Sequence, residues 1–443
     1  MEDLDIRVNR IAVVGAGWAG LAAAVELAAA GWEVDLFDAA RHAGGRARSV
    51  VIDGRKIDNG QHILLGAYRE TLRLIRLTGG DESRLLERIP LELAYPGLFA
   101  LRAVRWLPAP LHLLGGLLLA SGLAAGEKLS AVRFMVALVW QGFKVCPDLT
   151  VTALLGEHRQ SERVRRFLWE PLCVAALNTD PAQASAQVFA TVLADAFMGK
   201  RSDSDLLIPK THLDALFPDL ACAYLKTRLA TLHFGTPVLG LGRTTHGVRL
   251  ATSAGEHEYQ QVICALPPNR TRAIIQGIGD DDGFLNMLDA FDYEPIATCY
   301  LQYPDHVALE RPMIGLPGPI GQWAFDRGAL GGSRGLLAVV ISAAAHLRGI
   351  EADQLALLID REMRALVPDL PSADWHRVIT EKRATFRCSP GRKRPGVHSP
   401  IVGIFLAGDH TVDGYPATLE SAVRSGVNAA HAAINAARGP TGR

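Results

Sequence analysis

The segment Gly15-Ala16-Gly17-Trp18-Ala19-Gly20 decides the fold of the N-terminal part of this 443-residue chain. It follows the short apolar run 10–14, which predicts a buried parallel strand. It precedes the alanine-rich segment 21–30, which predicts a helix that ends at Gly31. A glycine-rich turn between a strand and a helix is typical of the start of a dinucleotide-binding unit.

The next segment, 32–38, alternates in polarity and predicts a second strand, which ends at Asp38. An acid about 20 positions after the last glycine completes the dinucleotide fingerprint. Gly15 allows a tight turn, Gly17 lets a pyrophosphate approach the backbone, and Gly20 lets the helix pack on the sheet. We expect the helix N-terminus to attract the anion and Asp38 to accept hydrogen bonds from ribose hydroxyl groups.

Two segments beyond Asp38 also offer groups to a ligand. The first, Gly44-Gly45-Arg46, combines a backbone that a ligand can approach with a positive charge for a phosphate or a flavin carbonyl. Its alternative interpretation is a surface turn. The second, Asp58-Asn59-Gly60-Gln61-His62, ends in a titratable side chain. That histidine is either a proton donor near a reacting carbon or a residue held by local hydrogen bonds.

These segments and the C-terminal Ala407-Gly408-Asp409-His410-Thr411, with Pro416-Ala417-Thr418, resemble the amine oxidase and phytoene desaturase superfamily. The resemblance implies FAD rather than NAD. It places Gly60 and Gln61 along the flavin ring, Asp409 at the ribityl chain or pyrophosphate, and 416–418 at the pyrimidine edge. The cofactor-binding residues implied by the fingerprint and the resemblance are Gly15, Ala16, Gly17, Trp18, Ala19, Gly20, Asp38, Gly45, Arg46, Gly60, Gln61, His62, Val238, Gly408, Asp409, Pro416, Ala417 and Thr418.

A narrower resemblance comes from the blocks 58–68, 169–178 and 407–426, which look like the squalene-associated FAD-dependent desaturases. That family is understood as hydroxysqualene dehydroxylase, acting in squalene and hopanoid biosynthesis. The resemblance implies that an acid protonates the hydroxyl of hydroxysqualene, and that hydride from reduced flavin reaches an allylic cation. His62 is the first candidate acid and His410 the second. His410 departs from the family pattern, which has Trp at that position.

Other functions remain open at this point. The first alternative is an oxidative desaturase of a C30 or C40 isoprenoid, which uses the same cofactor with the electron flow reversed. Others are another amine-oxidase-type flavoenzyme and a flavin-less carrier of prenyl chains. No motif identifies the electron donor that would reduce the flavin.

The implied fold is α/β, with a Rossmann-type FAD-binding domain interleaved with a mixed-sheet plus helical substrate domain. We expect the FAD-binding domain to comprise 1–69, 206–275 and 376–437. A helical region that faces the substrate or a membrane covers 70–205, a sheet and helix of the substrate domain cover 276–375, and 438–443 form a loose tail.

Composition excludes some partners and suggests a compartment. The 46 basic and 46 acidic residues balance, so no nucleic-acid partner is expected. The six cysteines contain no C-x-x-C pair, which predicts neither a metal site nor a disulfide framework and favours a cytoplasmic protein. The acidic N-terminus does not resemble a secretory signal.

The segment 106–126 contains no Asp, Glu, Lys or Arg. Its length admits three interpretations: a membrane-spanning helix, a surface that dips into one leaflet, or a buried hairpin that lines the substrate site. The resemblance implies a lipophilic isoprenoid substrate, and we expect this segment and the predicted apolar helix 130–143 to supply its apolar tunnel or membrane-side mouth. Peripheral contact with a membrane surface is expected as well.

Overall fold

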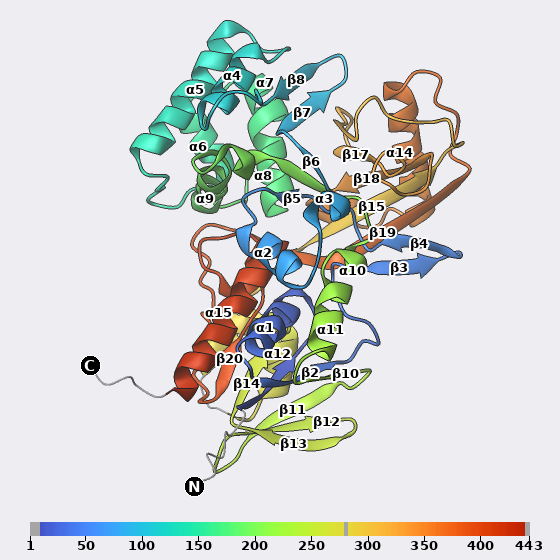
Figure 1. Cartoon of the computed structure of the whole chain (residues 1–443). Helices are drawn as coiled ribbons and strands as arrows, with labels where there is room; N and C mark the ends of the chain where they lie inside the picture. The colour runs from blue at the N-terminus through green and yellow to red at the C-terminus, as the bar shows by residue number, and fades with distance from the viewer. Residues whose placement is uncertain (1–8, 279–281, 439–443) are drawn as a thin grey trace.

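A five-stranded parallel sheet is the centre of the lower half of the molecule (Figure 1). The computed structural model describes residues 9–278 and 282–438. In the order of the sheet, the strands are β10 (Ala230–Phe234), β2 (Glu33–Asp38), β1 (Arg10–Val14), β14 (Gln261–Cys264) and β20 (Ile404–Leu406). Val13 pairs with Leu36 on one side and Ile263 on the other. Three distant parts of the chain therefore build one sheet.

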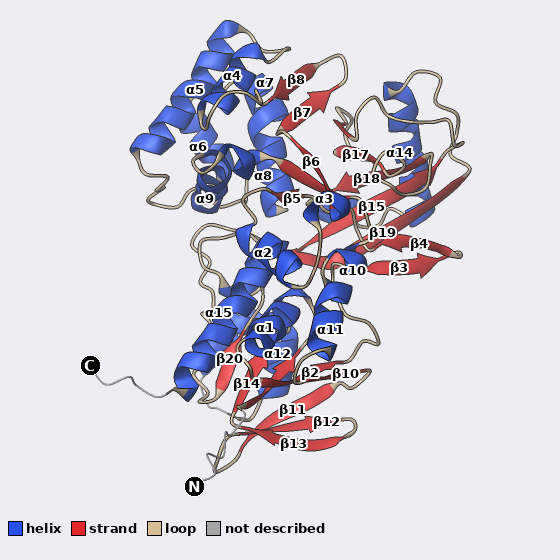
Figure 2. Ribbon diagram, viewed as in Figure 1, coloured by secondary structure: helices blue, strands red, loops and turns tan. Residues whose placement is uncertain are grey.

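Helices cover one face of this sheet and a small antiparallel sheet covers the other (Figure 2). The helices are α1 (Trp18–Ala29), α2 (Arg69–Leu77), α10 (Leu213–Leu216), α11 (Pro218–Lys226) and α15 (Leu419–Ala437). Gly426 lets α15 approach the α1 backbone, because a Cβ there would overlap the Ala19 carbonyl oxygen. The opposite face carries β11 (Val238–Arg243), β12 (Val248–Thr252), β13 (Gly255–Tyr259), α12 (Pro268–Ile275) and α13 (Asp282–Asp289).

A second five-stranded sheet is antiparallel. Its strands, in order, are β16 (Met313–Gly315), β17 (Trp323–Asp326), β18 (Leu336–Ile341), β15 (Tyr293–Gln302) and β19 (Trp375–Phe386). Helix α14 (Ala352–Leu366) packs on one face through the buried Ile359 and Met363. The other face presents Tyr300 and Trp323 to the helical part of the chain.

That helical part lies beside the second sheet at the top of the molecule (Figure 1). Its helices are α4 (Leu111–Leu119), α5 (Ala125–Trp140), α6 (Val151–Glu157), α7 (Glu162–Val164), η1 (Arg165–Trp169), α8 (Glu170–Leu177) and α9 (Ala186–Phe197). Shorter elements connect the halves: β3 (Ser49–Ile52), β4 (Arg55–Asp58), β5 (Leu64–Leu65), α3 (Glu82–Leu85), β6 (Leu86–Ile89), β7 (Glu92–Tyr95), β8 (Phe99–Arg102), η2 (Arg201–Ser204) and β9 (Leu206–Pro209). Two further short helices are η3 (Ala344–Leu347) and η4 (Asp409–Thr411).

The predicted α/β class, with a parallel nucleotide-binding sheet and a mixed second part, is confirmed. The region 70–205 is mostly helical, as expected, but it also contains β6, β7 and β8, which were not predicted. Strand β6 pairs with β9, more than a hundred residues later, and the local sequence pattern does not reveal such a partner. The positions of the domain boundaries stay a prediction. The expected tail lies, apart from Arg438, outside the described residues.

The uncharged segment 106–126 forms the nine-residue helix α4, the irregular chain on either side of it, and the first two residues of α5. Among the described residues, no helix combines the length and the apolar character needed to cross a bilayer.

Candidate functional site

The N-terminus of α1 is open to an anion. Gly17 is the N-cap residue, no side chain caps the helix, and its first turn has no acidic residue. A Cβ at Gly15 would lie 2.5 Å from the Ala265 carbonyl oxygen, and one at Gly20 would overlap the Gly15 carbonyl oxygen. A Cβ at Gly17 would meet nothing nearer than the Gly45 Cα, at 4.0 Å. Gly15 and Gly20 therefore serve the packing of the turn, whereas Gly17 leaves room for a ligand, as a pyrophosphate requires.

Asp38 stands beside this helix N-terminus. Its Oδ2 accepts a 2.6 Å hydrogen bond from the Ala16 amide, and its Oδ1 accepts a 2.7 Å bond from the Ala40 amide. Each carboxylate oxygen retains a further lone pair for a ribose hydroxyl. The Thr236 amide donates to the Asp38 carbonyl oxygen, which places the start of β11 and Val238 near the same strand end.

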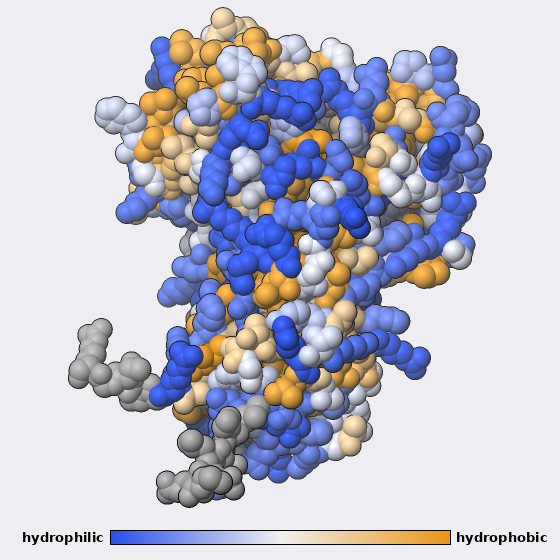
Figure 3. Space-filling model, viewed as in Figure 1, coloured by the Kyte–Doolittle hydropathy of each residue, from blue (hydrophilic) through white to orange (hydrophobic). Residues whose placement is uncertain are grey.

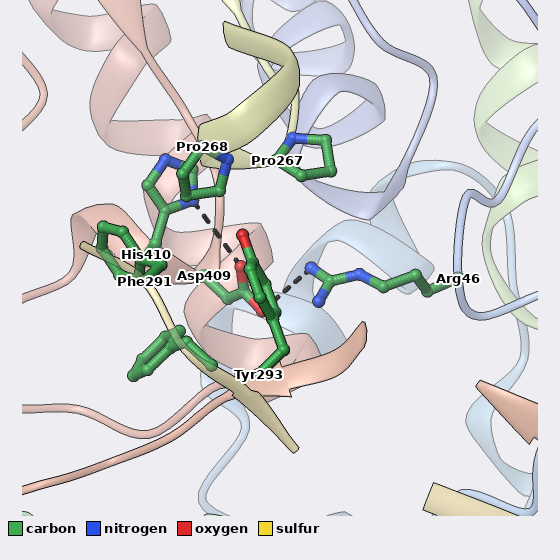
Figure 4. Close-up of a pocket in the computed structure, with 8 residues that line it drawn as sticks. Arg46, Pro267, Pro268, Phe291, Tyr293, Asp409 and His410 are labelled. Atoms are coloured by element: carbon green, nitrogen blue, oxygen red, sulfur yellow. Dashed lines mark hydrogen bonds and ion pairs between the residues drawn. The ribbon is translucent and has the colours of Figure 1, made fainter. Parts of the chain in front are cut away.

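An ion pair connects the Gly44-Gly45-Arg46 loop with the C-terminal box (Figure 4). Arg46 Nη2 lies 2.9 Å from Asp409 Oδ2, and Arg46 Nη1 donates to the Ala384 carbonyl oxygen at 2.7 Å. Burial alone would raise the pKa of Asp409, but the charge of Arg46 and the contact with His410 hold that pKa well below its usual range. In return, Asp409 raises the pKa of Arg46.

His410 lies on the other side of Asp409, where Figure 4 shows its ring next to Phe291. The imidazole is 1% exposed, and its Nδ1 lies 3.7 Å from Asp409 Oδ1, within reach of an ion pair but beyond hydrogen-bond distance. Among the described residues, neither ring nitrogen has a hydrogen-bond partner. The nearby Tyr293 hydroxyl is likewise buried without a partner. Buried polar groups without hydrogen-bond partners are costly, so two of them beside a partly buried ion pair fit a site that a polar ligand completes.

The segment 58–62 runs between β4 and β5, against β15. A Cβ at Gly60 would lie 3.5 Å from the Thr298 hydroxyl oxygen, which is itself buried and unpaired. His62 Nδ1 lies 2.9 Å from the Gly60 carbonyl oxygen. Since a carbonyl only accepts, Nδ1 carries the proton in neutral His62 and Nε2 holds the lone pair. Burial lowers the pKa of His62.

Segment 416–418 leads into α15. Thr418 Oγ1 accepts a 3.1 Å hydrogen bond from the Ser421 amide, so this helix N-terminus is capped by its own side chains. The acid in the first turn, Glu420, does not cap α15. Its carboxylate accepts hydrogen bonds from the amides of Glu70 and Thr71 and thereby caps α2.

Some predicted cofactor residues point elsewhere. The Trp18 side chain is buried in the core, donates to the Ala47 carbonyl oxygen at 3.1 Å and packs on Phe217. The Gln61 amide accepts a 3.1 Å hydrogen bond from Arg327. Of these two side chains, neither faces the Arg46–Asp409 pair. Their assignment to the cofactor remains a proposal that rests on their backbones.

The sequence did not identify several residues around the ion pair. Phe291, Tyr293, Phe386, Pro267 and Pro268 enclose Arg46, Asp409 and His410. Tyr293 and Phe386 pair across β15 and β19. Of these five residues, only Pro267 was expected near the cofactor, at the end of a strand predicted to close over it. Strand β19, which carries Phe386, was not predicted.

A separate cavity of about 320 Å³ has Asp58 in its wall. Its lining mixes charged and apolar groups: Lys56, Ile57, Asp58, His212, Tyr300, Arg327, Gly331, Gly332, Ser333 and Leu336. Such a polar lining does not suit a long hydrocarbon. Among the described residues, no group of three or more His, Cys, Asp or Glu side chains is arranged to hold a metal ion.

A family model described as flavin containing amine oxidoreductase matches residues 18–434. Among relatives, the chain is 27% identical to a hydroxysqualene dehydroxylase of Sinorhizobium fredii, over 96% of this chain and 99% of the relative. It is 29% identical to the hydroxysqualene dehydroxylase of Rhodopseudomonas palustris, over 96% of this chain and 98% of that relative. A 15-cis-phytoene desaturase of Synechococcus elongatus is 24% identical over 96% of both chains.

Solved structures share the fold. An oxidoreductase from Methanosarcina mazei superimposes with a TM-score of 0.74 at 14% identity, covering 96% of this chain and all of that one. A putrescine oxidase bound to putrescine superimposes with a TM-score of 0.71 at 16% identity, covering 96% of this chain and 99% of that one.

Proposed function

The chain belongs to the family of flavin-containing amine oxidoreductases and is an FAD-dependent oxidoreductase, and from this premise we propose that it converts hydroxysqualene reductively to squalene. The full-length similarity to three hydroxysqualene dehydroxylases supports this activity. Family membership also argues against a flavin-less carrier.

One structural observation carries the proposal. The two segments assigned to the flavin ring, 58–62 and 416–418, both border the largest apolar cluster among the residues that the structure describes. Ile63, directly after His62, packs against that cluster, and so does Ala417. The cluster also includes Trp323 and Phe386 from the antiparallel sheet and the side chains of several helices. Apolar surroundings at this point suit a long hydrocarbon and keep water from a cationic intermediate.

The cofactor would be held by groups that are far apart in the sequence. The N-terminus of α1 would face the pyrophosphate, Asp38 the adenosine ribose, and the Arg46–Asp409 pair the phosphate and ribityl region. The unpaired Tyr293 hydroxyl and His410 ring fit this assignment, because a polar ligand would supply their missing partners. When bound and reduced, FAD supplies a hydride with its two electrons.

His62 is the proposed proton donor. In the proposed reaction the allylic C–O bond breaks, the proton leaves with the oxygen as water, and hydride forms the new C–H bond. Neutral His62 presents a lone pair at Nε2, so only the imidazolium form donates from that atom. Because the pKa of His62 is lowered, its imidazolium form is a stronger acid than an ordinary imidazolium. For the same reason, a smaller fraction of His62 is protonated at neutral pH.

A desaturase of a C30 or C40 isoprenoid is the second candidate, favoured by the full-length match to a phytoene desaturase. It would use the same site with electrons flowing from substrate to flavin.

An anaerobic turnover experiment separates these functions. The flavoprotein is photoreduced, mixed with hydroxysqualene, and assayed for squalene by mass spectrometry while flavin absorbance is followed. We expect squalene to form as the flavin reoxidises. A flavin that stays reduced with no squalene would reject dehydroxylation. Bleaching of the oxidised flavoprotein by phytoene would support the desaturase instead. The flavin-free Gly17→Ala variant is the matched control.

A further inference from the structure

We propose that helices α4 and α5, with the loop before α4, dock the protein on an anionic lipid bilayer. We call this surface the α4–α5 face. It consists of Trp106, Leu111, Leu114, Leu118, Leu119, Leu129, Val136, Val139 and Trp140, with Arg105, Arg133 and Lys144 among them. The inference depends only on the chemistry of this surface and not on the substrate proposed above.

Exposed apolar side chains are concentrated on this face. Nine of the seventeen exposed large apolar side chains among the described residues lie between positions 106 and 140. Trp106, Leu119 and Trp140 are 81%, 79% and 88% exposed. Figure 3 shows the apolar surface gathered at the top left of the molecule, over α4 and α5. A patch of this kind on a single face marks an interaction surface.

Helix α4 is oriented with its small residues inward. A Cβ at Gly116 would lie 2.6 Å from the Arg102 carbonyl oxygen, and one at Gly115 would lie 2.9 Å from Leu107 Cδ1. The helix therefore packs on the protein through its glycines and points Leu118 and Leu119 outward. A helix on a water-exposed surface has the opposite arrangement, with large apolar residues buried.

Helix α5 continues the same surface. It buries Ala131, Phe134 and Leu138 and leaves Val136, Val139 and Trp140 exposed. Exposed tryptophans at the edge of an apolar patch are typical of the interface between headgroups and acyl chains.

Charge identifies the occupant of the face. Arg105, Arg133 and Lys144 are exposed, and among the described residues none of them has an ion-pair partner. Glu127, in the first turn of α5, accepts hydrogen bonds from the Ala124 amide at 2.9 Å and the Ser161 hydroxyl at 2.8 Å. An anionic leaflet complements such cations. A second copy of the chain in a symmetric dimer would place the same cations against each other without acids to balance them.

The test measures binding to vesicles. The flavoprotein is floated with vesicles of phosphatidylcholine alone or of phosphatidylcholine mixed with phosphatidylglycerol. We expect binding that is at least tenfold stronger with phosphatidylglycerol. The triple variant Trp106→Ser, Leu119→Ser and Trp140→Ser should lose at least tenfold in partitioning. The variant Arg105→Gln, Arg133→Gln and Lys144→Gln should lose the preference for anionic lipid.

A matched control carries Val51→Ser, Leu239→Ser and Val402→Ser, which replace side chains that are 71%, 63% and 80% exposed outside the α4–α5 face. It should bind vesicles within twofold of the wild type. Flavin content and turnover of detergent-dispersed substrate should stay unchanged in all variants, which separates a failure of docking from a failure of the proposed reaction.

Two results would overturn the inference. One is equal vesicle binding by the wild type and the apolar triple variant. The other is a wild-type dimer that binds no vesicles and that the triple variant converts to a monomer, since a second copy would then cover the face.

Discussion

Arg46 and Asp409 are 363 positions apart in the chain, yet Nη2 of Arg46 lies 2.9 Å from Oδ2 of Asp409. Arg46 also donates to the Ala384 carbonyl oxygen in β19. One guanidinium group thus joins the N-terminal glycine loop, the antiparallel sheet and the C-terminal box. Because the two segments that we propose to bind flavin meet at this pair, its loss should affect the cofactor before it affects the rest of the fold.

The Asp409→Asn variant tests the ion pair. Removal of the negative charge leaves Arg46 without its carboxylate partner, so we expect flavin to bind about tenfold to a hundredfold more weakly, or about 1.4–3 kcal/mol. Flavin fluorescence titration of the stripped protein measures this change. Arg361→Ser, at an exposed arginine on α14, is the control and should bind flavin as the wild type does.

The same pair predicts a dependence on pH. The pKa of Asp409 is depressed in the folded protein, so the carboxylate contributes stability above its unfolded pKa and loses that contribution as pH falls through the folded pKa. The difference in free energy of unfolding between wild type and Asp409→Asn should therefore be constant above about pH 5 and shrink below about pH 4. A difference that already disappears near pH 6 would contradict the depressed pKa.

Gly17 and Gly20 should respond differently to the same substitution. Gly17→Ala places a methyl group where no protein atom lies closer than 4.0 Å, so the protein should fold but retain little flavin. Gly20→Ala forces a methyl group onto the Gly15 carbonyl oxygen and should lower the free energy of unfolding by about 2 kcal/mol or more. Thermal melts and flavin absorbance distinguish the two effects. Full flavin retention by a folded Gly17→Ala protein would contradict the assigned pyrophosphate position.

His62→Gln tests the proton donor. The pKa of His62 is lowered by burial, and the proposed reaction requires its imidazolium form. The wild-type rate should therefore rise about tenfold per pH unit as pH falls from about 8 to about 6.5. His62→Gln should be slower by about a hundredfold at low pH and lose this slope. His346→Gln is the matched control, since His346 Nδ1 makes the same kind of local bond, 3.0 Å from the Ala343 carbonyl oxygen. A His62→Gln protein that keeps the slope would reject this role.

His410→Phe probes the buried imidazole. The substitution removes two nitrogens that have no hydrogen-bond partner, and with them the 3.7 Å contact of Nδ1 with Asp409 Oδ1, so the free energy of unfolding of the flavin-free protein should change by no more than about 1 kcal/mol. Flavin affinity should fall about tenfold if the imidazole completes its hydrogen bonds on the cofactor. In the control His112→Phe, the lost ring has a 2.8 Å contact with the Ser204 hydroxyl, so that variant should be less stable than wild type. Chemical denaturation and flavin titration give both quantities.

The sequence predicted the strand–helix–strand unit well because its signals are local. The apolar run, the glycines and the alanine-rich helix lie within about 30 residues, and β1, α1 and β2 follow them closely. The motif did not reveal that the Trp18 side chain packs into the core of the nucleotide-binding half. A motif position indicates where the backbone passes, whereas the direction of a side chain depends on packing that a motif does not encode.

The relationships within the site were less predictable. Arg46 and Asp409 were each expected to contact FAD, but their mutual ion pair depends on how two distant segments meet. Strand β19 is rich in charged residues and is held by its pairing with β15, so its own composition gave no strand signal. Tyr293 and Phe386 therefore entered the site only through the structure.

A single-turnover reaction in heavy water tests the central claim most directly. The wild-type flavoprotein is reduced in D₂O, where the reactive hydrogen of reduced flavin exchanges with solvent, and then mixed with hydroxysqualene without oxygen. If hydride from the flavin replaces the hydroxyl group, the squalene should carry one deuterium per molecule, with one flavin reoxidised per squalene formed. Squalene without deuterium, or no squalene from a fully reduced and substrate-saturated protein, would contradict the account.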